Sequence, residues 1–421
     1  MKRSLLFTTI LTLFIAGCNK SETTTPTQQD YNGTTIPLSE ALSNLDNLLD
    51  QLDIDTKASH SRTYSIKSVS DFGGQDICKT KATGIDIPDT LMYLVNFDDS
   101  EGFAVLAGDR RLSENVYCIT ENGNISKEDF ADAFDYLHSD SPLTKSNKRE
   151  KGEFIDIGQK FVPALMLSSM LADLKYGKVI EETDNNETKA QIKPSGVICL
   201  RTKWYQWAPF NNECPTDCPA GCVAIACAQV MQYCNLPSNP VFYGVQCSWE
   251  LMETVCNIND VSGLKSTEEA EYQVAKFISY VGNYDNCRIK YTTSASSGNS
   301  TGAVRAFKNA NFKDVKKYLG FGSKNQKRAS SMIGARLPIY IDGSDYHHGG
   351  GHAWVLDGDW NGYFHCNWGW NGKWDGFYAK HNYFPVDARE YVAAEDPGTT
   401  SDGVAKKDYD WDFSIITYMV H

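Results

Sequence analysis

The residues best suited to chemistry lie in the segment CPTDCPAGCVAIACAQVMQYC, positions 214–234, which holds five of the chain's thirteen cysteines. Cys222 follows Pro219-Ala220-Gly221, a turn of residues that break or spare a helix, and it begins a run of small and apolar residues typical of a buried helix. A thiol at a helix start faces unpaired backbone N–H groups and the positive end of the helix dipole. Both favour the thiolate, so Cys222 is the candidate nucleophile.

Two other uses of these cysteines are compatible with the sequence. A zinc ion could be bound by four of them, namely Cys214, Cys218, Cys222 and Cys227. Their spacings of four, four and five differ from the two separated CxxC pairs that structural zinc sites favour. A disulfide between Cys214 and Cys218 is the other alternative, and the sequence alone leaves it open.

A cysteine nucleophile needs a base, and His352 is the candidate. It lies 130 residues after Cys222, within the separation of about 130–150 residues found in the papain class. It follows the glycines Gly349, Gly350 and Gly351 and begins the apolar strand AWVLDG. Glycines allow another chain to approach closely, so Gly350 and Gly351 are predicted to bind substrate. A histidine with a purely structural role is the alternative.

The remaining catalytic functions are an orienting group for the histidine and donors for an oxyanion. The segment FHCNWGW, residues 364–370, lies one predicted hairpin after His352 and brings Asn367 or Trp368 toward the imidazole. Gln206, upstream of Cys222, carries an amide that could join the Cys222 backbone N–H in an oxyanion hole. Considered without the other residues, Trp368 is interpreted as a core residue and Gln206 as a surface residue.

Taken together, these segments resemble the streptopain-like cysteine peptidases of the papain-like clan. The matching blocks, in the family's order, are WYQWAPFN (204–211), CPAGCVAIACAQVMQY (218–233), GGHAWVLDG (350–358) and FHCNWGWNGKWDGFY (364–378). The resemblance implies an α+β fold over residues 197–421, with a helical part and an antiparallel β part. It also implies a cysteine endopeptidase that acts on proteins or peptides and needs no metal or organic cofactor.

The resemblance also assigns roles to individual residues. Cys222 is the nucleophile, His352 the general base and Gln206 the oxyanion donor. Asn367 and Trp368 sit beside the histidine, with the tryptophan covering the catalytic pair. Cell-wall amidases and transglutaminases use related Cys–His chemistry, and a binding or inhibitor protein could retain the fold without activity. The blocks around Gln206 and Trp368 argue against the two enzymes, and the complete set of catalytic residues argues against loss of activity.

The upstream half is predicted to be an α+β propeptide domain, residues 36–180. Residues 93–111 resemble the family's propeptide, which folds on the enzyme and inhibits it. Its elements are predicted as a helix with leucines at helical spacing near the start, a β-hairpin over 91–109 and a helix over 161–177. Residues 181–196 are polar and charged, and they are the predicted linker and processing site.

The N-terminus predicts export. Residues 1–17 combine two basic residues, a short apolar run and small residues, as in a secretory signal. The sequence IAGC ending at Cys18 resembles a lipobox, which implies lipid attachment to Cys18 at an outer or cell-surface membrane. An ordinary signal peptide is the alternative. Residues 18–35 are polar and predicted to be a flexible spacer.

Composition excludes one further class of partner. The chain of 421 residues has a formal net charge of −13, whereas nucleic-acid binding needs a basic surface. We therefore expect no nucleic-acid partner, and membrane contact only through the lipid anchor.

Overall fold

A computed structural model describes residues 33–56, 64–77, 85–139, 154–177, 199–255, 266–345, 349–383 and 411–420. The helices in these ranges are α2 (Leu38–Thr56), α3 (Lys127–Leu137), α4 (Phe161–Tyr176), α5 (Cys222–Tyr233), α6 (Trp249–Glu253), α7 (Glu268–Gly282), α8 (Ser300–Asn309) and α9 (Ser323–Gly334). The strands before α5 are β1 (Ile66–Phe72), β2 (Met92–Phe97), β3 (Phe103–Ala107), β4 (Val116–Thr120) and β5 (Phe154–Asp156). Those after it are β6 (Val241–Phe242), β7 (Val245–Gln246), β8 (Ser297–Gly298), β9 (Lys313–Leu319), β10 (Ile339–Asp345), β11 (Gly350–Trp360), β12 (Tyr363–Asn367), β13 (Gly376–Ala379) and β14 (Trp411–Met419).

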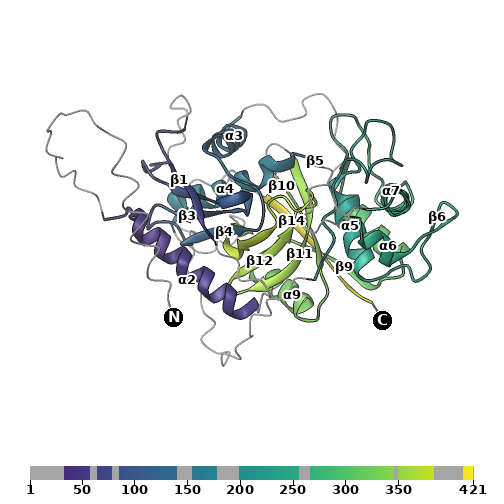
Figure 1. The fold of residues 1–421 in the computed structure, drawn as a ribbon. Helices are drawn as coiled ribbons and strands as arrows, with labels where there is room; N and C mark the ends of the chain where they lie inside the picture. The colour runs from purple at the N-terminus through teal and green to yellow at the C-terminus, as the bar shows by residue number, and fades with distance from the viewer. Residues whose placement is uncertain are drawn as a thin grey trace. The chain divides into compact units, whose positions relative to one another are not determined.

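One large sheet runs through both halves of the chain (Figure 1). Its strand order is β1-β2-β3-β4-β13-β12-β11-β10-β14-β9, and these neighbours pair antiparallel. In this order the upstream region, residues 36–180, supplies β1 to β4, and the downstream region, residues 197–421, supplies the other six strands. Upstream strand β5 pairs with β11 off this path. The two regions join where Thr120 of β4 pairs with Gly376 of β13. Hydrogen bonding therefore continues across the predicted propeptide boundary.

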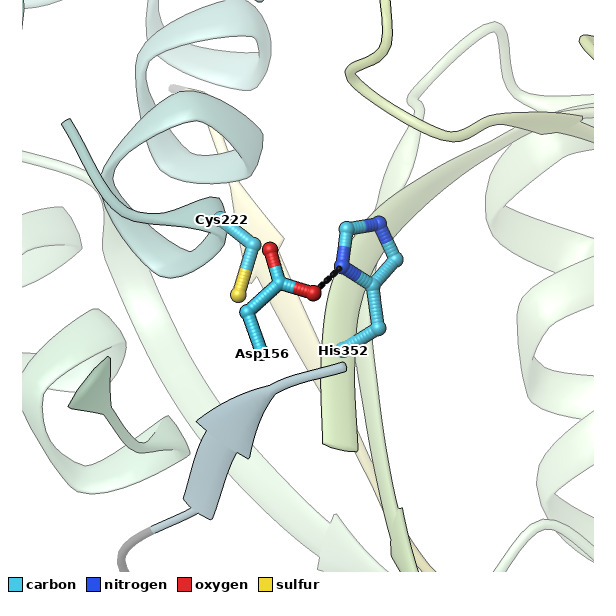
Figure 2. A group of neighbouring side chains, drawn as sticks. All are labelled: Asp156, Cys222 and His352. Atoms are coloured by element: carbon cyan, nitrogen blue, oxygen red, sulfur yellow. Dashed lines mark hydrogen bonds and ion pairs between the residues drawn. The ribbon is translucent and has the colours of Figure 1, made fainter. Parts of the chain in front are cut away.

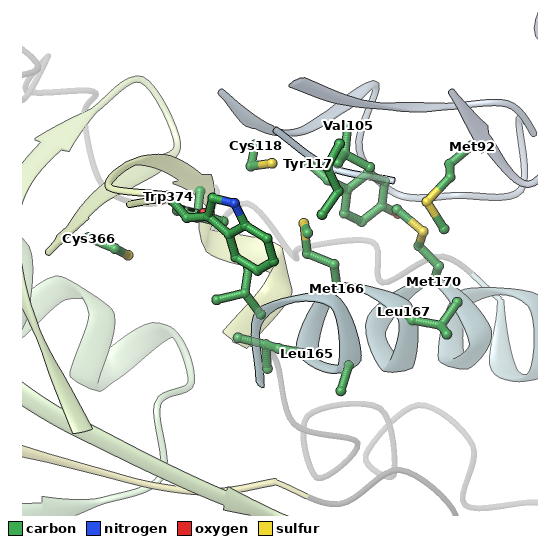
Figure 3. Close-up of a cluster of buried hydrophobic side chains, with 14 of the residues drawn as sticks. Met92, Val105, Tyr117, Cys118, Leu165, Met166, Leu167, Met170, Cys366 and Trp374 are labelled. Atoms are coloured by element: carbon green, nitrogen blue, oxygen red, sulfur yellow. Dashed lines mark hydrogen bonds between the residues drawn. The ribbon is translucent and has the colours of Figure 1, made fainter. Parts of the chain in front are cut away.

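Helix α4 carries much of the core that the two regions share. Its sequence, FVPALMLSSMLADLKY, is apolar on nearly every face, and its residues from Phe161 to Asp173 are all buried. Figure 3 shows Met166 and Met170 of α4 beneath upstream strands, with Trp374 of the downstream region in the same cluster. A helix covered on all sides obtains its stability from tertiary packing, so α4 depends on contacts with both regions.

A second core surrounds α5, the helix that begins at Cys222. Three alanines, Ala224, Ala226 and Ala228, are buried along it, and small side chains let neighbouring elements approach closely. The helix contacts α7, α8 and β11. It thus joins the helical part, which Figure 1 shows at the right, to the sheet that carries His352.

Most of the predicted elements are confirmed. The structure has the predicted α+β composition, and α2, α4, α5 and the β2–β3 hairpin lie where the sequence patterns place them. The turn between β11 and β12 has Asn361 and Gly362 at φ 43° and 86°, the left-handed conformation that an Asn-Gly hairpin turn requires. The predicted signal 1–17, Cys18 and the linker 181–196 lie outside the described residues. Within the described ranges, no helix has the length and apolar character needed to span a membrane.

Candidate active site

Cys222 is the first residue of α5, as predicted, and is 3% exposed. The preceding Gly221 has φ 89° and ψ 132°, a conformation that L side chains rarely adopt. A Cβ at that position would also lie 3.2 Å from Cγ2 of Ile289. Glycine therefore lets the chain turn sharply into α5 and sets the cysteine at its N-terminus.

His352 lies on β11, and its ring is fully buried. Its Nε2 lies 2.7 Å from the Trp368 carbonyl oxygen and its Nδ1 lies 3.1 Å from Oδ1 of Asp156. A carbonyl and an ionised carboxylate only accept hydrogen bonds. Both ring nitrogens therefore donate, so the geometry is that of an imidazolium.

Asp156 lies between the cysteine and the histidine (Figure 2). Oxygen of Asp156, Sγ of Cys222 and nitrogen of His352 all lie within 4.8 Å of one another. This aspartate ends β5, a short upstream strand that pairs parallel with β11 and antiparallel with β8. Gly350 and Gly351 of β11 are its strand partners. The edge predicted to bind substrate is therefore occupied by an extended segment of the same chain.

The environment keeps the thiol protonated. Burial, followed by the charge of Asp156, raises the pKa of the Cys222 thiol well above its ordinary value. Burial also opposes ionisation of Asp156, but attraction to His352 and hydrogen bonds from His352 and Gln206 lower the pKa of that carboxyl overall. The helix start favours a thiolate, as the sequence predicted, but here burial and the neighbouring carboxylate outweigh it.

Gln206 is in the same group. Its Nε2 donates to Oδ2 of Asp156 at 2.5 Å, and its backbone carbonyl accepts from Ala220 N at 2.8 Å. The second bond ties Gln206 to the turn that precedes Cys222. A cleft of about 490 Å³, lined in part by Asp156, Gln206, Trp207 and Trp370, opens beside these residues.

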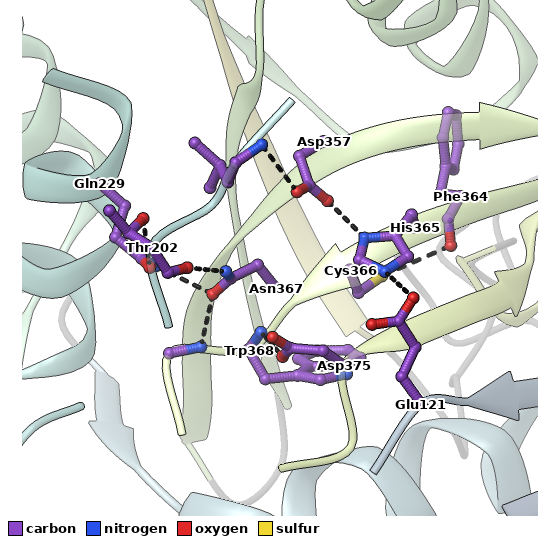
Figure 4. A network of polar contacts seen from close by, with 12 residues as sticks. Glu121, Thr202, Gln229, Asp357, Phe364, His365, Cys366, Asn367, Trp368 and Asp375 are labelled. Carbon is purple, nitrogen blue, oxygen red and sulfur yellow. Dashed lines mark hydrogen bonds and ion pairs between the residues drawn. The ribbon is translucent and has the colours of Figure 1, made fainter. Parts of the chain in front are cut away.

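Of the two predicted neighbours of His352, Trp368 contacts its imidazole, whereas the Asn367 side chain forms its hydrogen bonds elsewhere. Trp368 supplies the carbonyl that accepts from His352, and the two ring centroids are 6.1 Å apart. The ring of Trp370 is nearer, at 4.6 Å. The side chain of Asn367 hydrogen-bonds Thr202, Gln229 and the Gly369 backbone (Figure 4). In this structure, therefore, the Trp368 backbone orients the imidazole.

Two active-site residues were not predicted from the sequence. Trp370 belongs to the same tryptophan-rich segment as Trp368, so the segment was identified but the closest ring was not. Asp156 stands in FIDIG, a segment without any chemical motif. Its role arises from pairing of β5 with strands far along the chain, for which the sequence gives no local signal.

The alternative uses of the cysteines find little support. Cys214 and Cys218 are both free thiols. Among the described residues, the one group of three or more potential metal ligands is Asp156, Cys222 and His352. The structure thus does not gather the four cysteines considered for zinc. In the group that it does gather, the imidazole and the carboxylate bond each other directly.

Comparison with known proteins also points to a cysteine peptidase. Residues 204–378 match the model of the peptidase C10 family. This segment is therefore similar to the C10 peptidases. The C10 segment contains Cys222, His352 and Gln206, and the chain is a cysteine-type endopeptidase.

Individual relatives are distant. Streptopain of Streptococcus pyogenes serotype M1 is 24% identical to this chain over 321 residues, which cover 70% of this chain and 75% of streptopain. A fragment of prointerpain A from Prevotella intermedia is 20% identical with a TM-score of 0.47 and covers 77% of this chain and 94% of its own. Active interpain A is 20% identical with a TM-score of 0.39, covering 53% of this chain and 95% of its own.

Proposed function

We propose that this chain is the latent precursor of an exported cysteine endopeptidase, with residues 36–180 as its inhibitory propeptide. The observation that carries the proposal is the position of Asp156. One carboxylate oxygen bonds the predicted base, His352, and the other bonds the predicted oxyanion donor, Gln206. An upstream residue thus occupies the two partners that the reaction needs.

In the latent state Asp156 takes the place of two reacting groups. Its Oδ1 is the counter-ion of the His352 imidazolium, the position that the Cys222 thiolate takes in an active pair. Its Oδ2 accepts from Gln206, as a substrate oxyanion would. With the thiol and the imidazole both protonated, His352 has no free nitrogen to act as a base.

Departure of β5 allows the reaction. Without the Asp156 charge, Cys222 loses its proton to solvent and forms an ion pair with His352. The thiolate attacks the scissile carbonyl carbon, and the oxyanion is held by Gln206 and the Cys222 backbone N–H. His352 Nδ1–H protonates the leaving amine. Water then attacks the thioester and gives a proton to His352, which releases the acid product and the thiolate.

The export, anchoring and processing parts of the proposal rest on sequence alone. Residues 1–17 direct export, Cys18 carries the lipid, 18–35 is a spacer to the membrane and 181–196 is cut during activation. Asn367 supports the histidine indirectly, since its side chain fixes the segment that begins with Trp368. Gly350 and Gly351 bind substrate backbone after β5 leaves, because they already pair with an extended segment.

The test uses residues 19–421 under reducing conditions with casein present. The length of the chain and the degradation of casein are measured over time. Wild type is compared with Cys222→Ala and with Cys218→Ala, a matched loss of a nearby thiol. We expect wild type and Cys218→Ala to shorten near 181–196 and to degrade casein, whereas Cys222→Ala does neither. Casein cleavage by Cys222→Ala would overturn the nucleophile assignment. A folded, shortened wild type that leaves casein intact would favour an inactive binding homologue.

A further inference from the structure

Three buried histidines of the downstream region each face a carboxylate of the upstream region. The pairs are His352 with Asp156 at 3.1 Å, His365 with Glu121 at 3.5 Å and His381 with Asp173 at 3.2 Å. The first pair belongs to the active site. The other two take no part in the reaction, and they require another explanation because buried charges are costly unless they are paired.

The His381 pair joins a prepared acceptor to a donor from the other region. The Asp173 side chain is fully buried in α4. It accepts hydrogen bonds from Ser113 N and Ser113 Oγ, each at 2.9 Å, and from the Tyr117 hydroxyl at 3.3 Å. These donors all belong to the upstream region and fix the carboxylate in place. Nε2 of His381 then approaches it from the downstream region.

The His365 pair places one imidazole between carboxylates of both regions (Figure 4). Nδ1 lies 2.6 Å from Oδ1 of Asp357, a downstream residue, and Nε2 lies 3.5 Å from Oε1 of Glu121. Burial disfavours the charged ring, but attraction to Asp357 and Glu121 raises the pKa of His365 well above its ordinary value. The ring is thus held as a cation that faces the upstream region.

Several side-chain hydrogen bonds across the same boundary run in the same direction as the histidine pairs. Downstream side chains donate and upstream atoms accept in five such bonds: Tyr363 to Val116 O, Asn382 to Tyr117 O, Trp374 to Asn124 O, Trp411 to Ser168 Oγ and Lys373 to Gln159 Oε1. The β4–β13 ladder runs through this boundary. The downstream region therefore presents a docking face of side-chain donors, the imidazoles of His365 and His381 and a strand edge.

We propose that His365 and His381, through Glu121 and Asp173, are polar anchors that keep the upstream region, residues 36–180, bound to the downstream region after the linker has been cut. The inference rests on the proposed function for the division of the chain. It adds a second attachment, separate from Asp156. This attachment recognises the upstream region by the carboxylates of Glu121 and Asp173 and by the edge of β4.

The test measures dissociation without any need for catalysis. The full chain without residues 1–18 carries Cys222→Ala, and residues 183–189 are replaced by the recognition site of a specific protease. After cutting, the dissociation constant of the two pieces is measured by native mass spectrometry and dilution. Variants are His381→Leu, Asp173→Asn, their double variant and Glu121→Gln. The control is Glu40→Gln, which removes an exposed ion pair with Arg110 inside the upstream region.

We expect His381→Leu and Asp173→Asn each to raise the dissociation constant about 100-fold, or about 2.8 kcal/mol at 1.4 kcal/mol per tenfold change. The double variant should weaken binding little beyond either single change, because one interaction is lost in all three. Glu121→Gln should raise the constant about tenfold, since that pair is longer and partly exposed, and Glu40→Gln should leave it unchanged.

Two results would overturn the proposal. One is separation of the unsubstituted pieces at micromolar concentration as soon as the linker is cut. The other is a double variant whose effect equals the product of the single effects, which would mean that the two residues act independently on folding. Since the Cys222→Ala background is used throughout, neither result bears on the peptidase assignment, which the casein assay decides.

Discussion

Replacing Asp156 by alanine should make the uncut chain reactive at Cys222. The carboxylate of Asp156 accepts bonds from His352 and Gln206, and its side chain is 9% exposed. It also raises the pKa of the Cys222 thiol, after the larger effect of burial. Its removal therefore weakens the attachment of β5 and lowers the energy of the thiolate.

The magnitude follows from the two hydrogen bonds. Bonds to charged groups contribute about 1.5–3 kcal/mol each, and part of this is recovered when His352 and Gln206 find other partners. A net loss of about 3 kcal/mol corresponds to a rise of roughly 100-fold in the fraction of chains with an open site, at 1.4 kcal/mol per tenfold change. Asp156→Asn, which retains one acceptor oxygen, should have a smaller effect.

The assay is the rate of alkylation of Cys222 by iodoacetamide in the uncut chain, followed by peptide mapping so that other cysteines are scored separately. The control is Asp132→Asn, because Asp132 lines the same cleft and pairs with Lys160 at its exposed rim. We expect a rise of roughly 100-fold for Asp156→Ala, from the preceding free-energy difference, and no change for the control. An alkylation rate within twofold of wild type would refute the role given to Asp156.

Three further changes test other parts of the structure. Gln206→Ala should lower kcat of the processed enzyme about 10²–10³-fold with little change in KM, as loss of an oxyanion donor does, and an equal rise in KM alone would contradict that role. Burial raises the pKa of Asp342 from 3.8 to about 7, so this group stabilises the fold below pH 4 and loses that contribution as pH rises to 7. Relative to Asp342→Asn, the free energy of unfolding of wild type should therefore fall between pH 4 and pH 7 by up to about 4 kcal/mol. Urea unfolding measures this, and a difference between wild type and variant that is the same at both pH values would contradict it. Met166→Ala should destabilise the uncut chain by about 2–5 kcal/mol in one transition, because Met166 lies in the shared core, and two separate transitions in calorimetry would argue against a shared core.

The parts of the fold that the sequence predicted are those with a local signal. The apolar run of α4 and the small-residue run of α5 identify buried helices, and Asn361-Gly362 identifies a hairpin. Cys222 and His352 were likewise found from their immediate neighbours, the turn before one and the glycines before the other. These signals depend only on residues close in the sequence, so they can be recognised without knowing the tertiary contacts.

The parts that escaped prediction depend on contacts between distant segments. Asp156 became important only because β5 pairs with β8 and β11, and nothing in its own segment indicates that pairing. The raised pKa of the Cys222 thiol follows from burial first and from the charge of Asp156 second, and both depend on how distant segments pack. Trp370 lies closer to His352 than Trp368 does because of how the loop after β12 packs. The sequence of the segment does not indicate which of the two tryptophan rings contacts the histidine.

The pairing of β4 with β13 has a consequence for how the protein is made. Upstream residues are synthesised first and begin to fold first, so β4 presents an open edge until the distant β13 arrives to complete it. The upstream region, which we propose as an inhibitor, is therefore also a template for the sheet. A recombinant chain that starts at residue 197 must build its sheet with β13 exposed, and an uncovered edge strand invites pairing between molecules. Such a chain is expected to aggregate during expression unless the upstream region is supplied alongside it.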